Sequence, residues 1–242
     1  MAIPKVIHYC WFGDKPIPPK YQEFINEWRR ICPDYEIIKW DEKNYDTNSS
    51  TFTQEAFSYK QWAFIADYAR FDIVNKYGGI YLDIDVQLLK SFDHLIMNKA
   101  FFGIEKNFDH QLYVAPGLGF GAEKNNKVLQ GLLKLYEGIS FNPDHLVASP
   151  ILYKPYFEEL GFVQKNKIQE LSQAKIFPTE YFDSMDCFGK IKITKNTVST
   201  HHYAATWQNN HSNEEYLFKR CIYLFGNKLG EYVFQVLKHI RK

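Results

Sequence analysis

Apolar and polar positions along the first forty residues predict a strand, a helix and a second strand. Residues 5–12 are rich in β-formers and end at a Gly-Asp turn. From residue 19 to residue 30 the apolar side chains recur at helical spacing: Tyr21, Phe24, Ile25 and Trp28. Residues 35–40 form the second predicted strand. A strand, helix and strand at this spacing predict a βαβ unit and a parallel sheet.

The rest of the chain continues the alternation of helices and strands. A long helix is predicted over residues 54–77, ended by Gly78 and Gly79, with a strand over residues 80–89 directly after it. Short strands surround a glycine-rich loop in residues 100–121, and a helix follows over 126–138. Residues 214–242 predict two helices broken near Gly226. Because no linker or repeat is visible, we expect one domain over residues 1–242.

Charge and cysteine content narrow the class of protein. The 29 basic and 28 acidic residues leave a net charge of +1, which argues against a nucleic-acid binder. The cysteines are scattered, without the spacing of a zinc site, and this usage favours a reducing compartment. They are Cys10, Cys32, Cys187 and Cys221. The N-terminus shows no apolar signal core, so we expect a cytoplasmic protein.

The strand predicted at residues 80–89 carries the main candidate chemistry. Strand alternation would place Tyr81, Asp83 and Asp85 on one face and aliphatic side chains on the other. Aspartate is disfavoured in strands, and two carboxylates on one face repel each other unless a cation or water compensates. Oxygen ligands suit Mn²⁺ or Mg²⁺, so the pair predicts a metal site. The alternative is two solvated carboxylates on an edge strand.

Two further groups could complete such a site. Asp67 and Arg70 lie three residues apart and therefore on one helical face. They could hold a sugar hydroxyl and a diphosphate, or they could form an ordinary surface ion pair. The adjacent His201 and His202 could supply a third metal ligand, or they could be ordinary structural residues.

Together these segments resemble a known family. Residues 7–13 (IHYCWFG), 66–70 (ADYAR) and 77–85 (YGGIYLDID), with the His-His pair and Trp207, resemble the DXD-containing sugar transferases of glycosyltransferase family 32. That family includes bacterial capsular-polysaccharide transferases and yeast Golgi mannosyltransferases. A more distant similarity is to the glucosylating domains of large clostridial toxins.

The resemblance implies an α/β protein with the GT-A fold, a Rossmann-like nucleotide-sugar domain with a mostly parallel central sheet and C-terminal helices. It also implies Mn²⁺ (or Mg²⁺) and retention of anomeric configuration. Asp85 matches the direct metal ligand, with His202 favoured over His201 as its partner. Asp83 matches the carboxylate that faces ribose and donor sugar, with a link to the metal through water as an alternative.

The remaining donor contacts also follow from the resemblance. Trp11 matches the aromatic residue that stacks on the nucleobase, and Tyr81 matches a donor contact. Asp67 and Arg70 match the pair that holds the donor sugar and diphosphate. Trp207 matches a residue that closes over the diphosphate. We place Asp83, Asp85 and Arg70 in the catalytic group.

These features predict a hexosyltransferase that uses a nucleotide sugar, with a UDP-sugar favoured over a GDP-sugar. The expected acceptor is a glycan or lipid-linked oligosaccharide, in capsular polysaccharide or O-antigen (lipopolysaccharide) synthesis. The basic C-terminal helix could contact the inner face of the membrane, or it could pack on the domain. The rival functions are a haloacid-dehalogenase-type phosphatase using the DxDxV segment 82–86, and a non-catalytic carbohydrate-binding protein.

Overall fold

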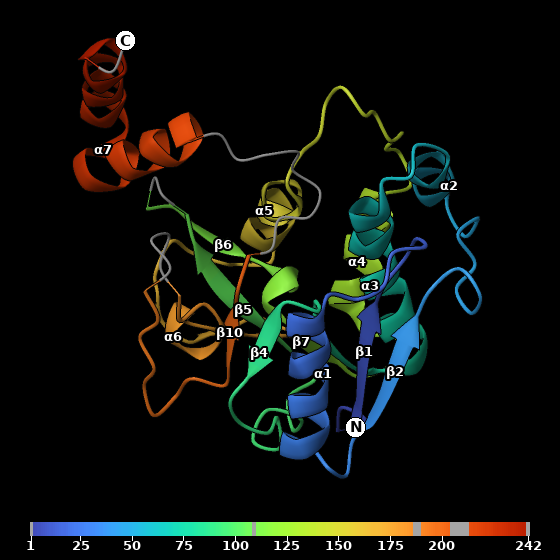
Figure 1. Ribbon diagram of the computed structural model, residues 1–242. Helices are drawn as coiled ribbons and strands as arrows, with labels where there is room; N and C mark the ends of the chain where they lie inside the picture. The colour runs from blue at the N-terminus through green and yellow to red at the C-terminus, as the bar shows by residue number, and fades with distance from the viewer. Residues whose placement is uncertain (1, 108–109, 186–189, 204–212, 241–242) are drawn as a thin grey trace.

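The central feature of the protein is a mixed sheet with helices on both faces (Figure 1). The computed structural model describes residues 2–107, 110–185, 190–203 and 213–240. The strands are β1 (Val6–Cys10), β2 (Glu36–Trp40), β3 (Gly79–Tyr81), β4 (Val86–Leu88), β5 (Ala100–Lys106), β6 (Leu112–Val114), β7 (Phe120–Ala122), β8 (Gln169–Glu170), β9 (Lys175–Phe177) and β10 (Ser199–His201).

Five of the strands in the main sheet run in one direction. The order is β2-β1-β3-β7-β5-β9-β8, with β6 paired to β5. β2, β1 and β3 are mutually parallel, and β9 is parallel to β5. β7 is antiparallel to both β3 and β5, so β5 runs the same way as β3. The predicted βαβ unit and the mostly parallel sheet are therefore confirmed.

The helices follow the periodicity of the sequence closely at the N-terminus and less closely in the middle. They are α1 (Pro19–Ile31), α2 (Thr51–Ser58), α3 (Trp62–Tyr77), α4 (Lys127–Leu135), α5 (Ser149–Glu159), α6 (Thr179–Phe182) and α7 (Asn213–Ile240). α2 begins with a capping box, in which Ser50 accepts from the Thr53 amide and the Thr53 hydroxyl accepts from the Ser50 amide.

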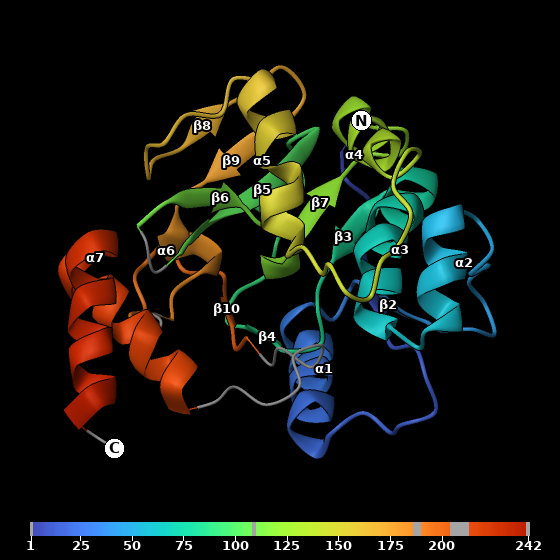
Figure 2. The same ribbon diagram turned by 90° about the horizontal axis from the view of Figure 1, so that it is seen from above.

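Two apolar cores hold the layers together. On one face of the sheet, α2 to α5 bury aromatic side chains such as Phe71, Tyr153 and Phe157 (Figures 1 and 2). On the other face, α1 packs on β4, and the indole of Trp28 donates to the Val86 carbonyl at 2.9 Å. These layers fix the loops at the carboxyl ends of β1 and β3, where ligands bind in open α/β sheets.

The structure corrects two boundaries expected from the sequence. The helix predicted over 54–77 is two helices, because Lys60 adopts φ 55° after α2 and the chain starts again at α3. The strand predicted over 80–89 is also interrupted. β3 joins the main sheet, whereas β4 pairs with β10 in a separate two-stranded sheet. The chain must bend between them, and the Val86 amide donates to the Asp83 carbonyl at 3.0 Å across that bend.

The C-terminal segment forms a helix with a break at Gly226, where φ is 74°. The predicted helix pair is thus confirmed, and it lies apart from the main sheet in Figure 1. His110, after β5, contacts the Tyr223 carbonyl at 3.1 Å. No helix in the described part of the chain combines the length and apolar character needed to cross a bilayer.

Candidate active site

The bend between β3 and β4 brings Asp83 and Asp85 together with His201 from the end of β10. One ligand atom from each of these three residues lies within 4.8 Å of the others. The His201 Nε2 atom is 3.1 Å from Asp85 Oδ1, and both side chains are about nine-tenths buried, with 12% and 9% exposed. The predicted carboxylate pair is therefore confirmed as a close group, although a bend rather than strand alternation creates it.

Pairing between β10 and β4 explains why a residue so distant in the sequence reaches this bend. The two strands are antiparallel, with His201 opposite Val86, the residue after Asp85. The next amide, that of His202, donates to the Asp85 carbonyl at 3.0 Å. These backbone contacts hold the end of β10 against the DXD segment.

The structure places His201, and not His202, beside the two carboxylates. The side chain of His202 points elsewhere: its Nε2 lies 3.1 Å from Gln87 Oε1, and its Nδ1 lies 3.4 Å from the Lys20 ammonium. Its ring also packs on Phe24. Adjacent residues in extended backbone point to opposite sides, so only one of the two histidines can face the carboxylates. The geometry therefore favours His201 over the expected His202 as the partner of Asp85.

Arg70 on α3 forms ion pairs with two carboxylates, those of Asp67 and Asp83. Its Nη2 atom lies 2.6 Å from Asp67 Oδ1 and 3.6 Å from Asp83 Oδ1, and its side chain is 5% exposed. The guanidinium also lies over the Tyr81 ring, 5.2 Å from its centroid. Asp67 and Arg70 therefore belong to a buried network with Asp83 and Tyr81, and they are not the surface ion pair that their spacing also allowed.

Burial and the surrounding charges set the protonation of this group. Burial lowers the pKa of His201, but the charge and hydrogen bond of Asp85, together with the charges of Asp83 and Glu105, raise it to about 9. Burial raises the pKa of Asp67 to about 6 against the attraction of Arg70. Burial likewise raises the pKa of Asp83, and Arg70 opposes that shift. The carboxylates thus carry a real desolvation cost that a bound cation would offset.

The residues present fit a divalent cation. Asp67, Asp83 and Asp85 against Arg70 are three carboxylates against one guanidinium, a formal excess of two negative charges when His201 is neutral. The Nδ1 atom of His201 is buried and has no hydrogen-bond partner among the described residues. Two carboxylates and an imidazole are a ligand set that Mn²⁺ accepts.

Sequence reasoning missed a glycine that lies against this network. A Cβ on Gly117 would lie 3.0 Å from Asp83 Oδ2 and 3.4 Å from Arg70 Nη1. Gly117 starts no regular strand but belongs to the 3₁₀ turn Pro116–Leu118 before β7. The glycine-rich loop was visible in the sequence, but nothing in it pointed to the network.

A second acidic group, also missed, lies near His201. Asp183 accepts from the Tyr203 hydroxyl at 2.5 Å and from the Lys106 amide at 3.0 Å. Burial, followed by repulsion from Asp183, raises the pKa of Glu105 to about 7. These residues come from three separate segments and share no motif, so no sequence signal was available.

The aromatic residues expected at the donor site differ in their burial and in their contacts. Tyr81 is 1% exposed, and its ring packs against the guanidinium of Arg70. Trp11 follows β1, is half-buried, and donates its indole N–H to the Lys15 carbonyl at 2.6 Å. Trp207 lies outside the described residues.

Comparison with known proteins gives this geometry a family context. Residues 18–102 match the family described as "Glycosyltransferase sugar-binding region containing DXD motif". Inositol phosphoceramide mannosyltransferase 3 of Schizosaccharomyces pombe is 35% identical over 99 residues, which are 39% of this chain and 28% of that protein. Inositol phosphoceramide mannosyltransferase 1 of the same yeast is 36% identical over 106 residues, 41% of this chain and 33% of that protein.

The chain therefore spans about a third or less of the length of these curated relatives. Among solved structures, the PaToxG glycosyltransferase superposes with a TM-score of 0.50 and 19% identity, covering 65% of this chain and 69% of that one. This likeness concerns the fold and confirms the expected GT-A architecture. The family match confirms the resemblance to DXD-containing sugar transferases.

Proposed function

We propose, from the match of residues 18–102 to the family of DXD-containing glycosyltransferase sugar-binding regions, that this chain is a metal-dependent, retaining glycosyltransferase. It would move a hexose from a nucleotide sugar to a glycan or a lipid-linked acceptor. The observation that carries the proposal is the convergence of Asp83, Asp85 and His201 beside the buried Arg70 network. A fold alone would not require these groups to meet.

The chain's own residues divide the work in this proposal. Asp85 and His201 would hold Mn²⁺ or Mg²⁺, and the ion would supply charge stabilisation for the departing diphosphate. Asp83 would face the ribose and the sugar of the donor. Arg70 adds a charge-assisted hydrogen bond to the same phosphates. Asp67, positioned by Arg70 at 2.6 Å, accepts a hydroxyl hydrogen bond from the donor sugar. The acceptor hydroxyl approaches on the face from which the diphosphate leaves, which accounts for retention without a dedicated nucleophile.

The identity of the donor and acceptor is a further part of the proposal. We place a UDP-sugar first, with Trp11 stacked on the base, and a GDP-sugar second. The matched yeast proteins are named as mannosyltransferases of inositol phosphoceramide, which supports an acceptor with a lipid part. A lipid-linked glycan in capsular polysaccharide or O-antigen synthesis agrees with that chemistry.

We also propose a peripheral contact with the inner face of the membrane through α7, which would place the enzyme in the cytoplasm. After the break at Gly226 the helix exposes Leu229, Tyr232 and Val236, which recur at one-turn spacing. Between residues 216 and 242 the sequence carries six lysines and arginines against one glutamate. An apolar strip within a basic segment is typical of helices that bind anionic lipid.

A sedimentation assay with vesicles tests the membrane contact. Leu229→Glu combined with Tyr232→Glu should abolish binding to vesicles of anionic lipid, while Met97→Glu, at a site that is 79% exposed, should leave binding unchanged. Equal sedimentation of both variants and the wild type would count against the contact. If the protein bound neutral vesicles and not anionic ones, the basic residues of this segment would have no part in membrane binding.

A donor screen with Mn²⁺ tests the function itself. Release of UDP or GDP from one nucleotide sugar, lost on chelation with EDTA, is the expected result. Hydrolysis of p-nitrophenyl phosphate without any nucleotide release would favour the phosphatase. Binding of a nucleotide sugar without release or transfer would favour the non-catalytic carbohydrate-binding protein.

A further inference from the structure

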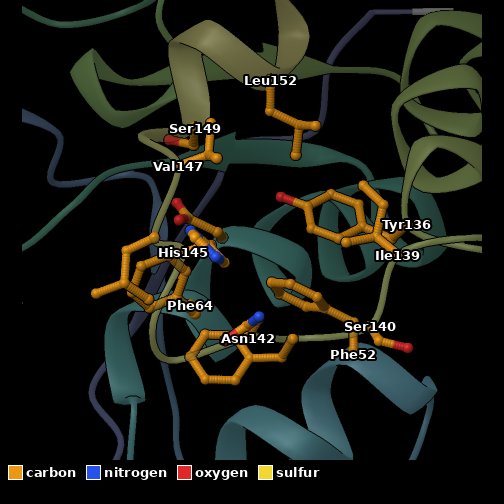
Figure 3. Close-up of a pocket in the computed structure, with 13 residues that line it drawn as sticks. Phe52, Phe64, Tyr136, Ile139, Ser140, Asn142, His145, Val147, Ser149 and Leu152 are labelled. Carbon is orange, nitrogen blue, oxygen red and sulfur yellow. The ribbon is translucent and has the colours of Figure 1, made fainter.

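A pocket of about 190 Å³ adjoins the Asp67 end of the network. Helices α2 and α3 form one side of it, and the segment from Tyr136 to Leu152 forms the other. Figure 3 shows the rings of Phe52, Phe64 and Tyr136 around the same space, with Leu152 and Ser149 at its edge.

The position of Asp67 connects the pocket to the proposed donor site. Its side chain lines the pocket and contacts Arg70 at 2.6 Å, and Arg70 lies 3.6 Å from Asp83. A donor sugar held by Asp67 and Arg70 would therefore have the pocket as its neighbour on the side away from the metal ligands. Asp67 is the residue that the pocket and the proposed donor site share, so a substituent near Asp67 is the part of the sugar that would reach the pocket.

The size of the pocket restricts what can enter. An apolar cavity of about 150 Å³ holds a benzene molecule, whereas sites for whole drug-sized ligands occupy roughly 300–1,000 Å³. A volume of about 190 Å³ thus accepts a group of a few heavy atoms. It is too small for a nucleotide or for a lipid chain.

The lining restricts the chemistry of that group. Eight of the thirteen lining residues are apolar, and these are Phe52, Phe64, Tyr136, Ile139, Phe141, Leu146, Val147 and Leu152. A hydroxyl group buried there without a partner would cost about 1–3 kcal/mol. The group that fits has an apolar body and one or two polar atoms near the end of the pocket where Asp67 lies.

We propose that the pocket receives the acetamido group of the donor sugar, so that the preferred donor is a nucleotide-linked N-acetylhexosamine. The amide N–H would donate to the Asp67 carboxylate, which also accepts a hydrogen bond from the Ser149 hydroxyl. The methyl group would lie among the rings of Phe52, Phe64 and Tyr136. This inference rests on the proposed function, because it takes the Asp67–Arg70 network as the donor site.

Matched donor pairs and matched variants test the inference. Binding by calorimetry and nucleotide release with Mn²⁺ are measured for UDP-N-acetylglucosamine against UDP-glucose, and for UDP-N-acetylgalactosamine against UDP-galactose. Val147 lines the pocket and is 51% exposed, so Val147→Trp can fill the pocket without disturbing the core. Val163, outside the pocket and 48% exposed, provides the control Val163→Trp.

The expected result is tighter binding of one acetamido donor than of its plain hexose partner. Val147→Trp should lower that preference at least tenfold, and Val163→Trp should not change it. Tight binding of an acetamido donor without nucleotide release would support the pocket and contradict the proposed transfer. Equal or weaker binding of both acetamido donors, or a preference unchanged in Val147→Trp, would overturn the inference even if plain hexose donors are turned over.

Discussion

The two aspartates of the DXD segment are two residues apart, yet their partners differ in kind. Asp83 faces Arg70, a cation that keeps its charge at every accessible pH and already holds Asp67. Asp85 faces His201, whose charge depends on a proton that it can release. The charge of Asp83 is therefore balanced by a permanent cation, Arg70. The charge of Asp85 is balanced by His201, which is a cation when it is protonated.

The difference indicates which side can accept a metal ion. A guanidinium cannot become a ligand, whereas a neutral imidazole can bind a metal through nitrogen. The Asp85–His201 side is thus suited to a divalent cation, and the Asp67–Arg70–Asp83 side is suited to the polar groups of a substrate.

The largest expected effect follows from removal of the permanent charge. Arg70→Met would leave Asp67 and Asp83 buried without their cation, and unfolding free energy should fall by about 3–5 kcal/mol in urea denaturation. Arg70→Lys keeps a positive charge, so its unfolding free energy should fall by less than that of Arg70→Met. Wild-type stability in Arg70→Met would show that the network is solvated and does not depend on this arginine.

On the other side, stability of the metal-free protein should depend on pH through His201. Its pKa is raised by Asp85 to about 9 in the folded state, so the contribution is fully present below about pH 6.5 and is lost as pH rises through 9. The full loss would be up to about 3 kcal/mol. Urea denaturation in EDTA from pH 6 to 9.5 measures it, and Asp85→Asn should flatten the profile. A slope unchanged in that variant would contradict the assignment.

Replacement of each histidine separates the two candidates for the metal ligand. His201→Ala should weaken Mn²⁺ binding at least tenfold, about 1.4 kcal/mol, because a ligand is removed. His202→Ala should keep the wild-type affinity within a factor of two, since its ring engages Gln87 and Lys20. Calorimetric titration with Mn²⁺ gives both values, and the reverse pattern would restore the assignment to His202.

The smallest effect comes from one added methyl group beside Asp83. Gly117→Ala would place a Cβ 3.0 Å from Asp83 Oδ2 and should raise donor KM a few-fold, by about 0.5–1 kcal/mol, without a change in Mn²⁺ affinity. Gly138→Ala has no atom within 4 Å of the new Cβ and serves as the control. A parallel loss of metal affinity in Gly117→Ala would show that the two sides are not independent.

Local sequence signals were sufficient for the first strand, helix and strand, over residues 5–40. The helical spacing of Phe24, Ile25 and Trp28 predicted α1, and turn residues marked both neighbouring strands. The bend at Asp83 was missed because the pairing of β4 with β10, more than a hundred residues away, decides it. Strand alternation assumes one continuous sheet, and that assumption failed at this bend.

The candidate site was predicted where motifs are local and missed where distant segments meet. Asp67 and Arg70 share a helical face, so their contact followed from spacing. At the end of β10, one histidine side chain points toward the DXD bend and the other points away from it. The sequence does not specify whether the first of these is His201 or His202. Gly117 and the pocket beside Asp67 arise from tertiary packing alone.

In the proposed function, transfer depends on an ion that Asp85 holds. The most direct measurement is nucleoside-diphosphate release by Asp85→Asn with saturating donor and Mn²⁺, next to a thermal unfolding curve of the same sample. We predict a loss of at least about a hundredfold, some 2.7 kcal/mol or more, in a protein that unfolds as cooperatively as the wild type. Wild-type release by the folded variant would contradict the claim.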